Sequence, residues 1–370
     1  MSTPSGRWGQ LPQADLWLHG ASAGDVRALM PLIEGIRHRW PDFTLLLTTQ
    51  TSTGAAMARR LCPDVPHRSA PLDLPWVAAR AVAQVRPRVL VLEYLELWPR
   101  QVAACARKGV PVMVVDGRVS QKSLRWRWLL KTTARRVSCF CGRSDGDRAR
   151  AVQLGVSPSK AFVCGNGKYD ALRVAPQPEE SLRAALGNPD VVVGSLHPDE
   201  FEAAMSALAG SSLRGVIAPR YPADSARIMA LGAHHGVSCA LRSEGPAPLA
   251  DWIVLDTMGE LAAAYGLASV AIVGGTFGRR GGQNLVEPAA HGVPVVHGPN
   301  VANITEEAEA LAGAGATEVP HWRAAVELAA VRCVDPGPDP RAALSALTGA
   351  TAAHLDHLAR LLASPQLPAA

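Results

Sequence analysis

Residues 88–117 read RVLVLEYLELWPRQVAACARKGVPVMVVDG, and this stretch indicates the fold class. Two runs rich in valine and leucine, RVLVLE and VPVMVVDG, flank a segment rich in alanine and arginine. Short apolar runs without alternation are typical of strands that are buried on both faces, as in parallel sheets whose strands are connected by helices. The stretch therefore predicts a strand–helix–strand unit of a parallel sheet.

The same rhythm continues on both sides of this stretch. Further apolar runs are DLWLHG (15–20), FTLLLTT (43–49), DVVVGS (190–195), RGVIAP (214–219), DWIVLD (251–256), SVAIVGG (269–275) and VPVVHG (293–298). This alternation of apolar runs and helical segments is interrupted between residues 170 and 190, where three prolines occur among acidic residues. We therefore predict an α/β protein with two Rossmann-like, doubly wound domains, residues 1–170 and 190–370, joined by a linker at 171–189.

Length and composition agree with this division. The chain has 370 residues, of which 48% are hydrophobic and 19% charged, which suits a globular protein of two domains. No apolar run approaches the roughly 18 residues of a membrane span, and the first residues do not resemble a signal peptide. We therefore expect a cytoplasmic protein. The seven cysteines form no CxxC pair, so we expect buried reduced thiols and no metal site.

Charge is distributed unevenly along the chain. Residues 1–170 carry a formal charge of +13 and residues 171–370 carry −8, so the two halves face different partners or different parts of one substrate. The most basic stretch, 118–150, carries +8. On a helix, its tryptophans and cations suit either a membrane interface or a core-packed helix with a solvated basic face. With 5% aromatic residues and no known binding motif, nucleic acid is not an expected partner.

Doubly wound sheets bind ligands beyond the carboxyl ends of their strands, so the loops that follow the apolar runs are candidate sites, and we expect a cleft between the two domains. HGASAGD places Asp25 at a strand-to-helix turn, where it acts either as a proton acceptor or as an ordinary helix cap. TSTG (51–54) supplies hydroxyls and a tight turn. LEYLELWP supplies Glu93 and Glu96, a pair that suits acid–base work but is also common at solvated helix starts.

The loops of the second half favour a nucleotide. A Gly-Gly turn opens a helix near Asn284 and offers backbone donors to a phosphate, while Glu287 can accept hydrogen bonds from ribose hydroxyls. Arg220, after the run GVIAP, is placed to balance phosphate charge. Each feature alone is compatible with turn chemistry, but together they predict a nucleotide pocket.

Nine motifs in this order resemble the 3-deoxy-D-manno-octulosonic acid (Kdo) transferases of lipopolysaccharide synthesis. They are HGASAGD, TSTG, ELWP, GRVSQKS, GNGKYD, APR, DTMGEL, GGQNLVEP and GPNVANITE, and they span about residues 17–311. The resemblance implies a GT-B glycosyltransferase fold and inverting, metal-independent transfer of Kdo from CMP-Kdo to a lipid A precursor or another anionic acceptor. From the charge and tryptophans of residues 118–150 we also expect peripheral contact with an anionic membrane, at the inner face of the inner membrane.

The resemblance assigns roles to individual positions. Asp25 is the general base, with Glu96 beside it. The remaining positions fall into two groups: the CMP moiety is held by Arg220, Met258, Gly259, Glu260, Asn284, Glu287 and Asn303, and the sugar or acceptor by Ser22, Gly24, Thr53, Gly54, Arg118, Ser120, Asn166, Lys168, Ser195 and His197.

Several positions depart from the family pattern. The family has Glu where this chain has Asp25, and histidines where this chain has Tyr221 and Gln283. Family members also commonly begin with a membrane anchor, which this sequence does not show. Two alternatives therefore stand beside Kdo transfer. One is a transferase for another CMP-activated ulosonic or sialic acid, and the other is a CMP-sugar-binding protein without catalysis.

Overall fold

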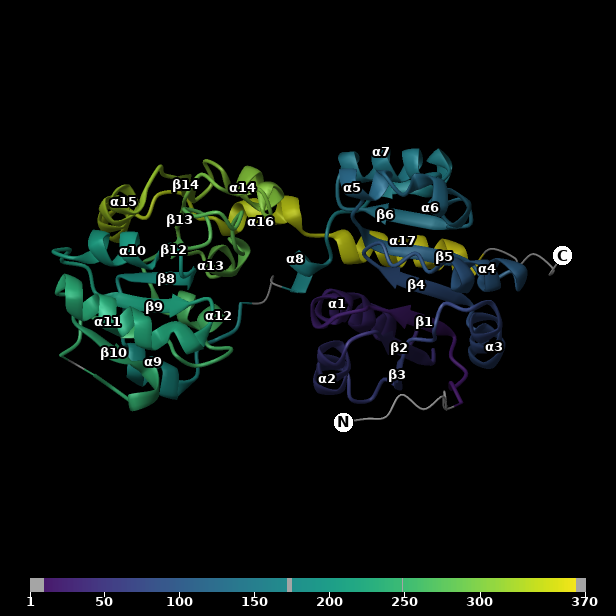
Figure 1. Cartoon of the computed structure of the whole chain (residues 1–370), viewed down its shortest axis with the longest axis horizontal. Helices are drawn as coiled ribbons and strands as arrows, with labels where there is room; N and C mark the ends of the chain where they lie inside the picture. Colours follow the sequence, from purple (N-terminus) through teal and green to yellow (C-terminus); the bar gives the residue numbers. More distant parts are fainter. Residues whose placement is uncertain (1–9, 172–174, 248, 364–370) are drawn as a thin grey trace. The chain divides into compact units, whose positions relative to one another are not determined.

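The computed structural model describes residues 10–171, 175–247 and 249–363, which form two compact units. Unit 1 comprises residues 1–171 and 348–370, and unit 2 comprises residues 172–347. Each unit contains a parallel sheet of seven strands with helices on both faces (Figure 1). The predicted α/β class with two doubly wound sheets is confirmed.

The sheet of unit 1 has the strand order β3-β2-β1-β4-β5-β6-β7. In register, Leu18 of β1 lies opposite Leu47 of β2 on one side and Val91 of β4 on the other. The strands are β1 (Leu16–His19), β2 (Leu45–Thr49), β3 (His67–Ser69), β4 (Val89–Glu93), β5 (Val112–Gly117), β6 (Cys139–Gly142) and β7 (Ala161–Val163).

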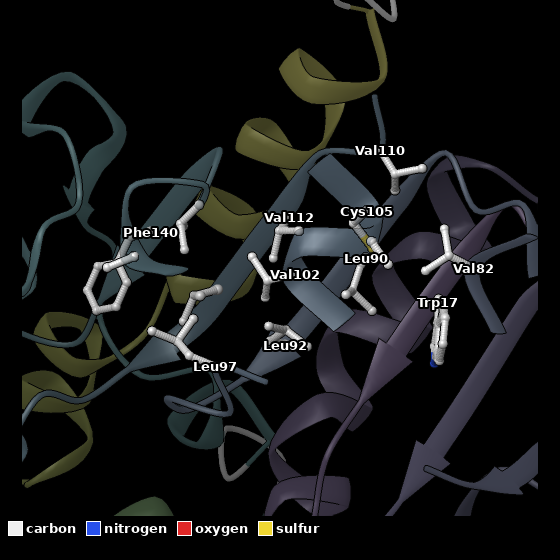
Figure 2. Close-up of a cluster of buried hydrophobic side chains, with 14 of the residues drawn as sticks. Trp17, Val82, Leu90, Leu92, Leu97, Val102, Cys105, Val110, Val112 and Phe140 are labelled. Atoms are coloured by element: carbon white, nitrogen blue, oxygen red, sulfur yellow. The ribbon is translucent and has the colours of Figure 1, made fainter. Parts of the chain in front are cut away.

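Helices cover both faces of this sheet. The longer helices are α1 (Ala23–Arg39), α2 (Ser52–Leu61), α3 (Pro75–Val85), α4 (Pro99–Arg107), α6 (Arg127–Ala134), α7 (Asp145–Leu154) and α17 (Ala350–Ala363), and the short ones are α5 (Gln121–Leu124), η1 (Pro158–Lys160) and α8 (Lys168–Ala171). Helices α1 and α17 pack on one face. Helices α3, α4, α6 and α7 pack on the other, around Trp17 and Phe140 (Figure 2). Burial of these branched and aromatic side chains on both faces is the main stabilising term of the unit.

The sheet of unit 2 has the strand order β10-β11-β9-β8-β12-β13-β14, again all parallel. Residues 191–193 of β8 lie opposite residues 270–272 of β12. The strands are β8 (Val191–Leu196), β9 (Gly215–Pro219), β10 (Cys239–Leu241), β11 (Trp252–Val254), β12 (Val270–Val273), β13 (Val295–His297) and β14 (Ala316–Glu318).

The helices of unit 2 also form two layers. They are α9 (Glu180–Leu186), α10 (Phe201–Leu208), η2 (Pro222–Asp224), α11 (Ser225–His235), η3 (Arg242–Glu244), α12 (Leu261–Ala264), η4 (Tyr265–Leu267), α13 (Val286–Ala290), α14 (Thr305–Leu311), α15 (Trp322–Val334) and α16 (Arg341–Leu347). Helices α10, α11 and α15 cover one face around Phe201 and Trp322. Helices α9 and α12 cover the other, around Tyr265.

Each sheet has a point at which the direction of strand order reverses. In unit 1 this point lies between β1 and β4, and in unit 2 it lies between β8 and β12. The loops that leave neighbouring strands in opposite directions open a crevice at such a point, where ligands of doubly wound sheets bind. The loops after β1, β4, β8 and β12 are therefore the first places to examine for function.

The observed units differ from the predicted domains at two places. Helix α9, inside the predicted linker 171–189, packs Leu182 and Leu186 onto the sheet of unit 2, while residues 172–174 of that linker lie outside the described residues. Helix α17, which the prediction placed in the second domain, belongs to unit 1 and packs Leu358 against α1. The second prediction erred because α17 is separated in sequence from every other described element of unit 1.

Candidate active site

The loop between β1 and α1 holds the predicted base in a defined position. The backbone N–H of Ser22 donates to Asp25 Oδ2 at 2.7 Å, and the Ser22 hydroxyl donates to the same oxygen at 2.8 Å. Ser22 in turn caps the helix by accepting from the backbone N–H of Asp25. This reciprocal arrangement is a capping box, so the structural role that the sequence allowed for Asp25 is present. Gly24 is exposed in the first turn.

Capping leaves half of the Asp25 carboxylate available. Both hydrogen bonds from Ser22 reach Oδ2, and among the described residues no protein donor bonds to Oδ1. The side chain is half-buried at the start of α1. One oxygen therefore orients the carboxylate, while the other has no protein donor among the described residues.

The loop after β2 packs directly against the Asp25 loop. The backbone N–H groups of Gln50 and Thr51 both donate to the Ala21 carbonyl at 3.0 Å. Thr51 caps α2 by accepting from the N–H of Gly54, and Thr53 contacts the Thr51 hydroxyl at 3.1 Å. A Cβ atom on Gly54 would lie 2.9 Å from the Ala21 carbonyl oxygen, so only glycine permits this approach. The TSTG turn therefore supports the loop that carries Asp25.

The loop after β4 brings Glu96 to the same edge. Glu96 is half-buried, and its pKa is raised by burial and, to a smaller extent, by the charge of Asp25. Further along the loop, the Trp98 indole N–H donates to His19 Nε2 at 3.3 Å. The two predicted catalytic carboxylates therefore share one environment.

His19, which the sequence analysis did not assign to the site, joins three strand ends. Because the Trp98 indole can only donate, Nε2 of a neutral imidazole must accept, and the proton lies on Nδ1. Nδ1 then donates to Thr48 Oγ1 at 3.0 Å, an oxygen that also accepts from Trp17 at 2.9 Å. Burial lowers the pKa of His19 to about 4. The sequence signal for this role was that His19 is the first residue of the motif HGASAGD, directly before Gly20.

A pH dependence of stability follows from His19. Because its folded pKa of about 4 lies below the usual histidine value of 6.5, its contribution to stability is complete above pH 6.5 and is lost as pH falls toward 4. The full loss corresponds to about 3 kcal/mol. We expect His19→Asn to flatten the decline of the melting temperature between pH 7 and 4.5. His38→Asn, at an exposed position on α1, should leave that decline as steep as in the wild type; equal slopes for both variants would refute the assignment.

Glu93 does not pair with Glu96 at the surface, as the sequence had suggested it might. Its side chain is 1% exposed and its pKa is raised well above the usual value by burial and by the charge of Asp116. The nearest cation is Arg143, whose Nη2 lies 3.8 Å from Oε1. Glu93 is thus an internal group beneath the loop rather than a substrate contact.

The remaining predicted residues of unit 1 lie at the ends of β5 and β7. Arg118 and Ser120 are exposed, and Ser120 caps α5 by accepting from the N–H of Ser123. Asn166 is buried and accepts from the backbone N–H of Lys168 at 3.1 Å. Asp147, which the sequence analysis missed, receives the N–H of Val119 at 2.8 Å and so fixes the loop of Arg118 and Ser120.

In unit 2, one buried carboxylate organises the loops at the β8/β12 crevice. Glu200 is 2% exposed, and its Oε2 accepts from the backbone N–H groups of His197 at 3.0 Å and Gly275 at 2.7 Å. Its Oε1 accepts from Phe277 at 2.9 Å and Gly278 at 3.2 Å. Sequence reasoning missed Glu200; its only signal was an acidic residue three positions after His197.

His197 has two neighbours that depart from the family pattern. Gln283 Nε2 lies 3.2 Å from His197 Nε2, and the Tyr221 ring meets the imidazole edge-on at 6.1 Å. Burial lowers the pKa of His197. Ser195, two residues earlier, has a left-handed backbone with φ of 55° at the end of β8. The positions that differ from the family pattern thus meet around one imidazole.

Asn284 and Asn303 stabilise the glycine-rich segment after β12. Asn284 Oδ1 accepts from the backbone N–H of Val286 at 2.9 Å, and its amide donates to Glu287 at 3.0 Å. The Asn303 amide donates to the Arg280 carbonyl at 2.6 Å, and its N–H donates to the Gly281 carbonyl at 2.7 Å. A Cβ on Gly281, whose φ is 82°, would lie 2.8 Å from Asn303 Nδ2. These residues shape the turn through which a nucleotide would contact backbone donors.

The last predicted nucleotide contacts lie at the ends of β9 and β11. Arg220 is exposed, and its guanidinium carbon lies 5.6 Å from the centre of the Tyr221 ring. Met258 is 81% exposed, and Gly259 has a φ of 88°. Glu260 accepts from Arg242 at 3.3 Å and from the Thr257 hydroxyl. The exposed side chains of Arg220 and Met258 are free of the core and available to a ligand.

Comparison with known proteins decides the family. The model of the family described as 3-deoxy-D-manno-octulosonic-acid transferase (kdotransferase) matches residues 3–171. A 3-deoxy-D-manno-octulosonic acid transferase of Bordetella pertussis is 34% identical over 94% of this chain and 86% of its own length. The chain belongs to the Kdo transferase family. The resemblance read from the motifs is thereby confirmed.

Solved structures confirm the fold of this family member. A glycosyltransferase from Rickettsia africae is 11% identical, with a TM-score of 0.67 over 96% of this chain and 100% of its own. MurG from Acinetobacter baumannii is 14% identical, with a TM-score of 0.59 over 93% of this chain and 99% of its own. At these identities the likeness bears on fold alone, and it supports the GT-B class predicted for this Kdo transferase family member. Among the described residues, no helix has the length and apolar character needed to span a membrane.

Proposed function

We propose that this protein transfers Kdo from CMP-Kdo to a hydroxyl of a lipid A precursor by a single inverting displacement. Family membership supports the reaction class. The observation that carries the chemistry is the Asp25 carboxylate, whose Oδ2 is held by Ser22 while Oδ1 has no protein donor among the described residues. A fixed carboxylate with one accessible oxygen suits removal of a proton from an attacking alcohol.

In this proposal the acceptor oxygen attacks the anomeric carbon of Kdo as Asp25 Oδ1 takes its proton. The bond between that carbon and the phosphate oxygen breaks on the opposite face, and CMP leaves with the bonding pair. Glu96 lies beside Asp25, and burial together with the charge of Asp25 raises its pKa. Ser22, Gly24, Thr53 and Gly54 shape the loops around this position.

The donor would be held by unit 2. Arg220 is placed to balance the phosphate, and the turns at Met258–Glu260 and Asn284 offer polar groups to the nucleotide. Glu287 and Asn303 keep the second of these turns in shape. Arg118, Lys168 and Ser120 in unit 1 are candidate contacts for the anionic sugar or acceptor. We propose that no step of transfer requires a metal.

One observation favours a second candidate. Tyr221 and Gln283 surround His197 where the family pattern has histidines, which alters hydrogen bonding in the predicted donor region. A different CMP-activated ulosonic acid as donor would be consistent with this change. The reaction class and the role of Asp25 would be the same.

Release of CMP distinguishes these possibilities. The protein is incubated with CMP-Kdo or a CMP-sialic acid, each with a lipid A precursor or with buffer alone. We expect CMP release from CMP-Kdo only when the lipid is present. Release from the sialic acid donor alone would favour the second candidate, and binding of CMP-Kdo without release under any condition would contradict catalysis.

We also propose that the basic segment 118–150 contacts an anionic membrane. Within this segment the structure forms two short helices, α5 and α6, before β6 and the start of α7, and it leaves Trp126 54%, Trp128 71% and Leu129 50% exposed. Arg127 and Lys131 are exposed beside them. Exposed tryptophan next to cations is typical of a protein surface at a lipid headgroup layer.

Sedimentation with vesicles tests this contact. We expect the protein to sediment with vesicles containing anionic lipid at low salt and to be released at high salt. Trp128→Ala should weaken partitioning about tenfold, because the indole loses roughly 1.4 kcal/mol or more of apolar burial. Trp76→Ala removes a tryptophan that is 69% exposed outside the segment and should have no effect. Equal partitioning of the two variants would contradict the proposal.

A further inference from the structure

Three side chains that can bind a soft metal meet at one edge of the sheet of unit 1. They are Cys141 at the end of β6, Cys164 after β7, and His354 in α17. One ligand atom from each lies within 4.8 Å of the other two. In a tetrahedral zinc site the bond lengths of about 2.0–2.3 Å separate ligand atoms by roughly 3.3–3.8 Å. Small rotations of the side chains would therefore close the observed set around an ion.

His354 is the least explained member of this cluster. It is 1% exposed, and its Nε2 has no hydrogen-bond partner among the described residues. The nearest carboxylate oxygen, Asp116 Oδ1, lies 3.8 Å away, beyond hydrogen-bond distance. A buried imidazole nitrogen without a partner is costly, and a metal bond would satisfy it.

The two cysteines complete a donor set of soft character. Cys141 is fully buried and Cys164 is half-buried. Cys139 Sγ lies 3.7 Å from Cys141 Sγ, so a third sulfur lies beside the cluster. Two thiolates and a neutral imidazole favour Zn²⁺ over the hard cations, which prefer oxygen.

We propose that Cys141, Cys164 and His354 bind one Zn²⁺ ion that fastens α17 to the sheet of unit 1. His354 lies in the last described helix, far in sequence from both cysteines, so binding closes a long loop. A metal that binds only the folded arrangement adds its binding free energy to folding. The ion is structural, and the proposal stands independently of the reaction assigned to Asp25.

Metal titration of the full-length, reduced protein tests this. After chelation, addition of Zn²⁺ should load one ion per chain and raise the melting temperature. Co²⁺ should give the charge-transfer absorption of cobalt–thiolate bonds. Cys141→Ser, Cys164→Ser and His354→Gln should each weaken binding at least tenfold, since even loss of a supporting group around a metal commonly costs 10–100-fold.

Two matched variants serve as controls. His357→Gln alters the next histidine of α17, which stacks on Phe162 at 4.1 Å, and Cys239→Ser alters a half-buried thiol of unit 2. Both should keep one ion per chain. If the ligand variants fold poorly, alkylation of the wild type replaces them: Zn²⁺ should protect Cys164 and not Cys239. Absence of bound metal, undiminished binding in the ligand variants, or a Cys141–Cys164 disulfide in the metal-treated protein would each overturn the proposal.

Discussion

Asp25→Asn is expected to lower kcat for Kdo transfer by about 10²- to 10⁴-fold, the usual contribution of a positioned general base. The amide keeps an oxygen that can accept from Ser22 but can no longer take a proton. The capping box should therefore survive in part, with a loss of about 1 kcal/mol or less in the free energy of unfolding. Initial-rate assays of CMP release measure kcat, and calorimetry measures the affinity for CMP.

Two further variants separate the base from the cap. Ser22→Ala removes one of the two hydrogen bonds to Asp25 Oδ2 and leaves the carboxylate, so kcat should fall far less than in Asp25→Asn. Asp25→Glu introduces the residue of the family pattern and should retain measurable transfer. CMP affinity should be unchanged in all three. If Asp25→Asn and Ser22→Ala have equal rates, Asp25 serves only as a cap.

Glu200→Gln is expected to cause the largest loss of stability in unit 2. The carboxylate accepts four backbone N–H groups, and glutamine has only one carbonyl oxygen with which to replace them. At about 1.5–3 kcal/mol for each hydrogen bond to a charged group, with partial rearrangement, the free energy of unfolding should fall by about 3 kcal/mol. For a unit of this size the melting temperature should fall by roughly 6–12 °C.

The same substitution should weaken donor binding. The four N–H groups belong to the loops after β8 and β12, so their release disorders the crevice assigned to CMP-Kdo, and we expect CMP to bind at least about tenfold more weakly. Glu202→Gln is the matched control, because Glu202 is exposed in the first turn of α10, two residues after Glu200, and pairs with His235. Calorimetry under the same conditions compares the CMP affinity and the melting of the two variants. Unchanged melting and CMP affinity in Glu200→Gln would show that the loops do not depend on this carboxylate.

The sequence predicts the fold well where strands are buried on both faces. All nine apolar runs correspond to strands, from β1 to β13. Five strands were missed. β3 has the polar sequence HRS at the sheet edge, β7, β10 and β14 have three residues each, and β6 is the four-residue buried segment CFCG within the basic stretch. Only tertiary pairing makes such short segments strands. The same limit explains α17, whose place in unit 1 depends on contacts that no local pattern encodes.

The candidate site is predicted in part. Motif resemblance brings Asp25 and Glu96 to neighbouring loops, and the structure agrees because β1 and β4 are adjacent. It could not reveal that Glu200 collects four backbone donors, since three of them lie 75 to 78 residues further along the chain. Nor could it separate half-buried Glu96 from fully buried Glu93, because their difference arises from packing around Asp116 and Arg143. Polar contacts between residues that are distant in sequence are therefore the part of the site that could not be predicted.

The mass of the lipid acceptor after incubation with CMP-Kdo tests the central claim most directly. The account predicts that the wild-type protein adds the mass of Kdo to the lipid A precursor and that Asp25→Asn, at equal CMP occupancy, adds none within the same time. A lipid of unchanged mass in the wild-type reaction, or full conversion by Asp25→Asn, would contradict it.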